Sequence, residues 1–206
     1  MAKMHARRYW LVAVLAAVSL IAGAAPPQEA GREEAARFMS ELMGGTAPVG
    51  GPFTLQDQYG NSRSLAEFRG SVVLLYFGYA FCPDICPTDL AAMAELVRTL
   101  GASGDAVQPV FVTLDPERDT AAVLRSYAAA FHPRLIALRG REQDIRRAAT
   151  SYKVSFEKVK LESGNYVIDH MAFIFVLDRQ GRYAAFFPPG TSAQRMKPVV
   201  SEMLER

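Results

Sequence analysis

Cysteine is scarce in this chain of 206 residues, and neither sign of charge is in large excess. The two cysteines, Cys82 and Cys86, lie four residues apart, so they cannot cross-link distant segments, which excludes a disulfide-stapled scaffold. Of the 23 lysines and arginines, three lie in the first ten residues, which leaves 20 against 21 acidic residues in the remainder. A nearly neutral body gives no electrostatic argument for a nucleic acid as partner.

The first 25 residues have the pattern of a targeting segment. Met1–Arg8 is basic, and the 17 residues of Tyr9–Ala25 carry no charge. This pattern predicts a secretory signal peptide or an N-terminal membrane anchor over residues 1–25, because about 17 residues is the lower edge of what spans a bilayer. A basic head stays in the cytoplasm, so we expect the body on the periplasmic side of the cytoplasmic membrane, either anchored there or soluble after cleavage. Thiols in such a compartment are exposed to oxidation.

The rest of the chain is predicted to be a linker followed by one α/β domain. Residues 26–46 form the expected linker, which could contain a short helix, and residues 47–206 form the domain. Residues 53–64 predict an N-terminal β-hairpin. The continuous apolar run Ser71–Phe77 predicts a strand buried on both faces. Further strands are expected at 108–114, 135–138, 153–158, 172–177 and 183–187, and helices at 87–100, 120–131, 142–151 and 192–205.

This order of elements indicates the fold class. Strands that alternate with helices, followed by a hairpin and a final helix, favour a three-layer α/β sandwich. The cysteine pair directly after the first buried strand narrows this class to the thioredoxin-like folds. We therefore expect a thioredoxin-like three-layer α/β sandwich with a central mixed sheet and an N-terminal β-hairpin. Asp119 is the expected N-cap of the helix over 120–131.

The cysteine pair is the first candidate for chemistry. Pro87 suits the first position of a helix, which places Cys86 at the expected N-cap, where free N–H groups and the helix dipole favour a thiolate. Two thiolates on one loop form a soft ligand pair, which selects Cu(I) and, less distinctively, Zn(II). The spacing of Cys82 and Cys86 is one residue longer than in a redox CxxC motif, but it does not exclude disulfide chemistry.

A metal site on two cysteines needs a third ligand, and the expected exported domain contains two histidines, His132 and His170. His132 follows a predicted helix, where a capping or surface role is expected. His170 precedes an apolar strand, where both a buried core histidine and a metal ligand stay open. Asp169 beside it could orient the imidazole. Met171 should point to the opposite face of the strand, which argues against it as a ligand.

Three motifs in order resemble those of the Sco/SenC family. They are Cys82-Pro83-Asp84-Ile85-Cys86-Pro87, Val112-Thr113-Leu114-Asp115-Pro116-Glu117-Arg118-Asp119-Thr120, and Asp169-His170 before a strand that ends at Leu177-Asp178. The resemblance covers about residues 50–205. That family consists of exported or membrane-tethered copper proteins with a thioredoxin-like fold. The resemblance implies that Cys82, Cys86 and His170 are copper ligands and that Asp169 and Asp115 belong to the surrounding shell.

The resemblance also implies a function, which is delivery of copper to the dinuclear copper centre of cytochrome c oxidase. The implied partner is the copper-accepting subunit of the oxidase, with a copper donor or a thioredoxin-like reductant as further partners. The two cysteines and the histidine would hold Cu(I) in a three-coordinate site, and Cu(II) with an added oxygen ligand. This predicts a metallochaperone and not an enzyme. Two alternatives stay open: a thiol–disulfide reductase that acts on the acceptor's cysteines, with Cys82 and Cys86 as its redox-active pair, and a redox- or copper-sensing interaction protein.

Overall fold

The structure, a computed structural model, describes residue 37 and residues 39–44 and 48–206. Residues 38–206 form one compact unit. The predicted targeting segment over 1–25 lies outside the described residues, as does most of the predicted linker. No helix in the described ranges is both long and apolar enough to cross a bilayer. Part of the expected linker nevertheless packs on the domain, because the carbonyl oxygen of Leu42 accepts a hydrogen bond from the Tyr183 hydroxyl at 2.8 Å.

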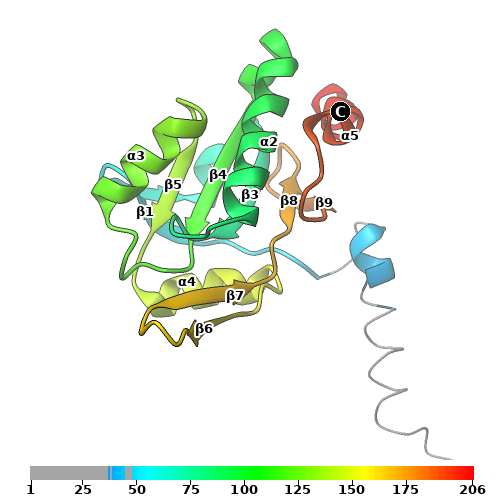
Figure 1. Cartoon of the computed structure of the whole chain (residues 1–206). Helices are drawn as coiled ribbons and strands as arrows, with labels where there is room; N and C mark the ends of the chain where they lie inside the picture. Colours follow the sequence, from blue (N-terminus) through cyan, green and yellow to red (C-terminus); the bar gives the residue numbers. More distant parts are fainter. Residues whose placement is uncertain (1–36, 38, 45–47) are drawn as a thin grey trace, which may run out of the picture. The chain divides into compact units, whose positions relative to one another are not determined.

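A mixed sheet forms the centre of the domain, as predicted (Figure 1). Within the described residues its strand order is β2-β1-β5-β4-β3-β8-β9. β3 is parallel to β4, and β4 is parallel to β5, whereas the other neighbouring pairs are antiparallel. The strands are β1 (Thr54–Asp57), β2 (Ser62–Ser64), β3 (Val72–Gly78), β4 (Val107–Thr113), β5 (Ile136–Arg139), β8 (Ile174–Leu177) and β9 (Tyr183–Phe187).

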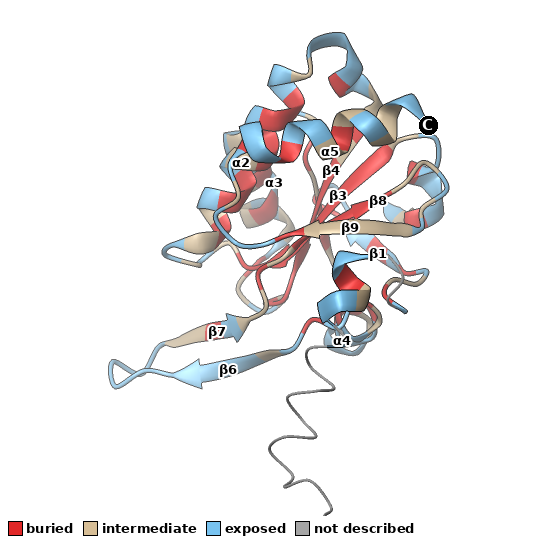
Figure 2. Cartoon of the chain, turned by 90° about the vertical axis from the view of Figure 1, so that its right-hand side faces the viewer, coloured by how far each residue is buried: buried red, intermediate tan, exposed pale blue. Residues whose placement is uncertain are grey.

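Helices cover both faces of this sheet and produce the predicted three layers. Helices α2 (Ile85–Thr99), α3 (Ala121–Phe131) and α5 (Ala193–Glu205) lie on one face, and α4 (Glu142–Ser151) lies on the other (Figure 2). Adjacent residues of β3 show why both faces are apolar. Tyr76 stacks on Phe111 on the α3 side, while Phe77 packs on Tyr152, which follows α4. Two short 3-10 helices, η1 (Leu65–Phe68) and η2 (Gly101–Ala106), complete the connections.

The N-terminal β-hairpin is confirmed, since β1 and β2 pair with Gln56 opposite Ser62. The Asp57 carboxylate closes the turn by accepting the N–H groups of Tyr59 and Asn61, both at 2.9 Å. Gly60 has a φ of 87°, a backbone conformation that glycine adopts at no steric cost. The turn therefore forms from local residues, as the sequence pattern indicates.

A second hairpin, β6 (Phe156–Lys160) with β7 (Tyr166–His170), forms a separate two-stranded sheet that extends from the domain (Figure 2). The predicted strand at 153–158 is shifted by about two residues, and the strand over 166–170 was not predicted. His170 was expected at the entry to a buried strand. It is instead the last residue of β7, and β8 begins four residues later at Ile174. Because most of β6 is exposed, it lacks the buried face that identifies a strand in a sequence.

Candidate metal centre

The cysteine loop lies at the carboxyl end of β3, next to the start of β8. Because these strands are antiparallel with Tyr76 opposite Ile174, the segment that enters β8 comes close to the loop that leaves β3. Helix α2 begins at Ile85 with Asp84 as its N-cap, so the prediction of Cys86 as N-cap is wrong. Cys86 is the second residue of the helix and Pro87 the third. A proline is tolerated there, because the first N–H groups of a helix have no partner within it.

The topology brings Cys86 and His170 into contact although they lie 84 positions apart in the chain. The Cys86 Sγ is 3.5 Å from the His170 Nε2. The rings of Tyr76 and Tyr79 stand edge-on to the imidazole, with centroids 6.4 and 6.0 Å away. The Nδ1 of His170 is buried and has no hydrogen-bond partner in the described part of the chain. The imidazole therefore presents Nε2 to the sulfur.

The two thiols have very different environments. Cys86 is fully buried, whereas Cys82 is half-buried, and neither forms a disulfide. Hydrogen bonds from the Cys86 thiol, the His170 imidazole and the N–H groups of Asp84 and Cys86 lower the pKa of Cys82 to about 3. The same interaction with Cys82, together with burial, raises the pKa of Cys86. The sequence offered the helix start as the place for a thiolate, and the structure assigns the thiolate to Cys82, chiefly because its sulfur accepts a hydrogen bond from the Cys86 thiol, with the N–H groups at the helix start adding to the effect.

The absence of a side chain at Gly78 makes room for the Cys86 sulfur. A Cβ atom at Gly78 would lie 2.9 Å from the Cys86 Sγ, 2.9 Å from the Tyr76 Cε1 and 3.2 Å from the Phe111 Cε2. A Cβ atom does not come within 3.0 Å of another heavy atom in a packed interior without displacing it. A glycine is therefore required at position 78, the last residue of β3, where the backbone lies against the Cys86 side chain of α2.

Two buried polar groups near Cys86, the Asp89 carboxyl and the Tyr76 hydroxyl, were not predicted from the sequence. Asp89 lies three residues after Cys86 on α2 and is fully buried, and burial raises the pKa of its carboxyl. Its Oδ1 accepts the Gly190 N–H at 2.8 Å, which ties α2 to the segment before α5. Its Oδ2 and the Tyr76 hydroxyl have no hydrogen-bond partner among the described residues. The signal was an acidic residue one helical turn after a cysteine, on a helix face that is otherwise apolar.

Asp115 is fully buried, as we expect of a residue in the shell around the metal centre. Its side-chain hydrogen bonds and ion pair are not to the cysteines. It forms an ion pair with Arg118 and accepts a hydrogen bond from the Tyr166 hydroxyl at 2.9 Å. Asp119, expected as the cap of α3, is buried instead and accepts the Ala80 N–H at 2.9 Å and the Thr113 hydroxyl at 2.5 Å. Thr120 caps the helix. Asp119 thus ties the loop before Cys82 to the end of β4.

The structure does not bring Asp169 to the imidazole. Asp169 is exposed opposite Glu157, and its side chain points to the other face of β7 from His170. His132, the alternative histidine, caps the C-terminus of α3, and its Nδ1 accepts the Arg134 N–H at 3.2 Å. Arg134 in turn contacts the carbonyl of Val107 at the amino end of β4, the end of the sheet away from the cysteine loop. His132 therefore has the capping role that the sequence predicted.

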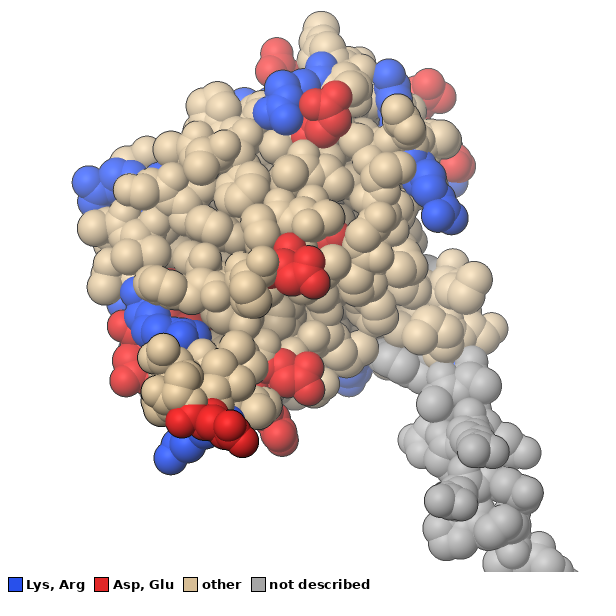
Figure 3. All heavy atoms as spheres, in the orientation of Figure 1, with Lys and Arg blue, Asp and Glu red and all other residues tan. Residues whose placement is uncertain are grey.

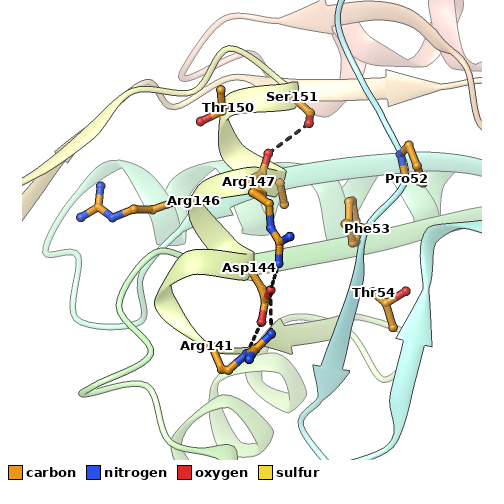
Figure 4. Close-up of a pocket in the computed structure, with 10 residues that line it drawn as sticks. Pro52, Phe53, Thr54, Arg141, Asp144, Arg146, Arg147, Thr150 and Ser151 are labelled. Atoms are coloured by element: carbon orange, nitrogen blue, oxygen red, sulfur yellow. Dashed lines mark hydrogen bonds and ion pairs between the residues drawn. The ribbon is translucent and has the colours of Figure 1, made fainter.

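The structure brings candidate metal-ligand side chains, Cys82, Cys86 and His170, into one region. No three Cys, His, Asp or Glu side chains in the ranges 39–44 and 48–206 already surround a metal position. A cavity of about 790 Å³ lies elsewhere, between α4 and the segment before β1, and it contains none of the predicted site residues (Figure 4). There Asp144 forms ion pairs with Arg141 at 2.6 Å and with Arg147, so its carboxylate is already paired with cations.

Two free cysteines and a histidine that meet beyond the carboxyl end of β3 are typical of proteins with thiol-based metal or redox chemistry. The chain belongs to the SCO1/SenC family, whose model matches residues 42–205. It is 40% identical to an SCO2-like protein of Rickettsia prowazekii over 150 residues, which is 72% of this chain and 73% of that protein.

Solved structures show the same fold. The copper-bound crystal structure of Arabidopsis thaliana ScoI matches with a TM-score of 0.72 and 32% identity, over 76% of this chain and 98% of that chain. BsSco, described as a member of the Sco family of cytochrome c oxidase assembly proteins with a disulfide switch, matches with a TM-score of 0.60 and 26% identity. That match covers 76% of this chain and 95% of BsSco. The predicted family and fold class are thereby confirmed.

Proposed function

We propose that this protein is a copper metallochaperone that holds copper through Cys82, Cys86 and His170 and delivers it to the dinuclear copper centre of cytochrome c oxidase. The observation that carries the proposal is the 3.5 Å approach of the His170 Nε2 to the Cys86 Sγ, beside a second cysteine with a strongly lowered pKa. The copper-bound ScoI structure and the assembly family named for BsSco support it.

The donor set fits copper as cargo. Two sulfurs and one imidazole nitrogen are soft to intermediate ligands, which suit three-coordinate Cu(I), and an added oxygen ligand would complete a more planar Cu(II) site. Cys82 is already a thiolate at neutral pH, so it binds metal without first losing a proton. Cys86 must lose its proton, and copper provides the positive charge that offsets its burial. We expect the side chains of Cys82, Cys86 and His170 to move closer to one another when copper binds.

Transfer of copper requires that the partner protein can reach the ligand side chains. Cys82 is half-buried and its neighbour Phe81 is 53% exposed, so acceptor ligands can approach from this side and replace the protein's ligands in turn. A hollow of about 590 Å³ beside Phe81 is lined by uncharged residues of the cysteine loop and α3. Figure 3 shows broad uncharged surface between separate groups of charged side chains. We propose that the copper-accepting oxidase subunit docks on the uncharged hollow beside Phe81.

The second candidate is a thiol–disulfide reductase, favoured by the unequal pKa values of the two thiols. In this reaction the Cys82 thiolate attacks a target disulfide, forms a mixed disulfide and releases one target thiolate, which takes up a proton. The Cys86 thiol then loses its proton, attacks Cys82 and releases the second target thiol. The target gains two electrons and two protons, and Cys82–Cys86 becomes a disulfide. A thioredoxin-like reductant would restore the dithiol.

For both candidates we propose an exported protein on the periplasmic side of the membrane, with residues 1–25 as signal or anchor. Mass spectrometry of the N-terminus from the native host tests this. A start near residues 24–26 supports cleavage, and an intact N-terminus supports an anchor.

His170→Ala separates the two candidates. Copper carriage predicts that Cu(II) binding is largely lost, that Cu(I) binding weakens, and that metallation of the acceptor falls, because the nitrogen ligand is missing. Reductase chemistry predicts that disulfide reduction is nearly unchanged in His170→Ala and is abolished in Cys82→Ser. His132→Ala is the matched control, since it removes an imidazole at the other end of the sheet. Unchanged Cu(II) binding in His170→Ala would contradict the proposed ligand set.

A further inference from the structure

Arg118 lies between the two segments that carry the proposed ligands. It belongs to the loop between β4 and α3, and its guanidinium carbon is 3.7 Å from the centroid of the Tyr166 ring. The same carbon lies 5.3 Å from the Phe81 ring and 5.7 Å from the Tyr79 ring. Tyr79 and Phe81 lead into Cys82, whereas Tyr166 begins β7, the strand that ends at His170. One cation therefore contacts both the sulfur-bearing and the nitrogen-bearing segments.

Polar contacts fix Arg118 to the hairpin. Its Nη1 donates a hydrogen bond to the carbonyl oxygen of Tyr166 at 2.9 Å, and its Nε forms an ion pair with Asp115. Asp115 in turn accepts the Tyr166 hydroxyl at 2.9 Å. Tyr166 is thus held through its main chain, its ring and its hydroxyl. The fully buried carboxylate of Asp115 and the planar guanidinium make these contacts directional.

The rest of the hairpin has weaker attachments. β6 and β7 pair only with each other within the described sheets, and four of the five residues of β6 are exposed. The ion pair of Lys158 with Glu117, at 2.7 Å, lies on the surface, where such pairs contribute little. Two attachments therefore position His170: the burial of Ile168 in the core, and the Arg118 cluster, by which we mean Arg118 with Asp115, Tyr166, Tyr79 and Phe81.

We propose that Arg118 is a positioning residue for His170. It holds the start of β7 against the cysteine loop and so keeps the Nε2 of His170 within reach of the Cys86 Sγ. Loosening of this contact withdraws the nitrogen ligand and leaves copper on the two sulfurs, the state from which an acceptor takes it. The role in handover rests on the proposed copper function, but the structural coupling between Arg118 and the hairpin does not.

The test compares Arg118→Gln with Glu117→Gln, which removes the surface ion pair to the hairpin and leaves the Lys158 ammonium over the Tyr166 ring. In the metal-free protein, amide exchange of β7 should become about tenfold faster or more in Arg118→Gln, with β3 unchanged. Glu117→Gln should leave both unchanged. Arg118→Lys keeps the charge but loses the planar stacking and two-sided hydrogen bonding, and we expect an intermediate effect. It also provides a folded variant if Arg118→Gln does not fold.

Copper binding gives the second readout. Arg118→Gln should weaken Cu(II) binding about tenfold in the otherwise native protein and less than about twofold in the His170→Ala background, because Arg118 acts through His170. Equal losses in both backgrounds, or unchanged exchange in β7, would overturn the proposal. If the native protein binds no copper, the proposed function fails, while the exchange measurement still decides whether Arg118 positions the hairpin.

Discussion

The two sides of the candidate copper site are built in different ways. The sulfur side, which we define as Tyr76, Gly78, Cys86 and Asp89, lies between β3 and α2, and Tyr76, Cys86 and Asp89 are fully buried. The histidine arm, which we define as β6 and β7, has an exposed first strand, buries Ile168 of its second strand, and is otherwise attached by charged and aromatic contacts around Arg118. Core packing tolerates little displacement, whereas surface contacts exchange readily. From this contrast we expect the sulfur side to keep its geometry and the histidine arm to adjust if copper enters and leaves.

The largest expected effect concerns the reactivity of Cys82. Because its pKa is about 3, the rate of alkylation of Cys82 should change by less than about twofold between about pH 8 and pH 5. An ordinary thiol of pKa about 8.5 slows about a thousandfold over that interval. Iodoacetamide labelling with peptide mapping measures the rate. A tenfold decrease per pH unit, or faster labelling of Cys86, would show that the thiolate is assigned to the wrong cysteine. In Cys86→Ser much of the pH dependence should return, since hydrogen bonding from the Cys86 thiol is the largest cause of the shift.

Gly78→Ala tests how rigid the sulfur side is. The new methyl group would meet the Cys86 Sγ and the Tyr76 ring at 2.9 Å, so it should lower the free energy of unfolding by about 1–3 kcal/mol. It should also displace the sulfur and weaken copper binding. Denaturant unfolding and copper titration measure the two effects. Gly51→Ala is the control, because its nearest contact is the half-buried Ser151 side chain at 3.3 Å. Equal stability of the two variants would contradict a tightly packed sulfur side.

Tyr76→Phe tests the buried hydroxyl next to Cys86. In a Cys82→Ser background, loss of this hydroxyl should raise the pKa of Cys86 further and slow its alkylation several-fold, because a hydroxyl near a thiolate stabilises the charge. Tyr152→Phe is the matched control. It removes another buried hydroxyl without a described partner, on the other face of the sheet, where Tyr152 packs on Phe77. The same rate in both variants would show that the Tyr76 hydroxyl does not act on Cys86.

The smallest expected effect is at the base of the histidine arm. The guanidinium of Arg146 on α4 lies 4.6 Å from the centroid of the Phe156 ring at the start of β6 and pairs with Glu142. Both contacts are at the surface, so Arg146→Ala should reduce the free energy of unfolding by only about 0.5–1 kcal/mol and leave copper binding unchanged. Thermal unfolding and copper titration check this. A loss of Cu(II) binding as large as that of Arg118→Gln would mean that the arm is positioned from α4 as well.

Local sequence patterns were sufficient for much of the architecture. The run of apolar residues in β3, the turn at Gly60 and the apolar stripes of the helices each arise from neighbouring residues, and these elements form where the sequence predicts them. The order of strand, cysteine loop and helix also pointed to Cys82 and Cys86 as candidate ligands. The first residue of α2 did not follow from the sequence, because Pro87 is tolerated at several positions of a first turn.

The sequence by itself determined the central strands, the cysteine loop and the set of candidate donors, since these depend on residue type and short spacing. The tertiary structure decided which groups meet. It placed His170 at the end of a hairpin outside the central sheet, 84 residues from Cys86, and joined Tyr166 to Asp115 across 51 residues. It buried Asp89 without a full set of partners and left Asp169 in solvent. No local pattern contains these outcomes, because burial and long-range hydrogen bonds exist only once the sheet has brought distant segments together.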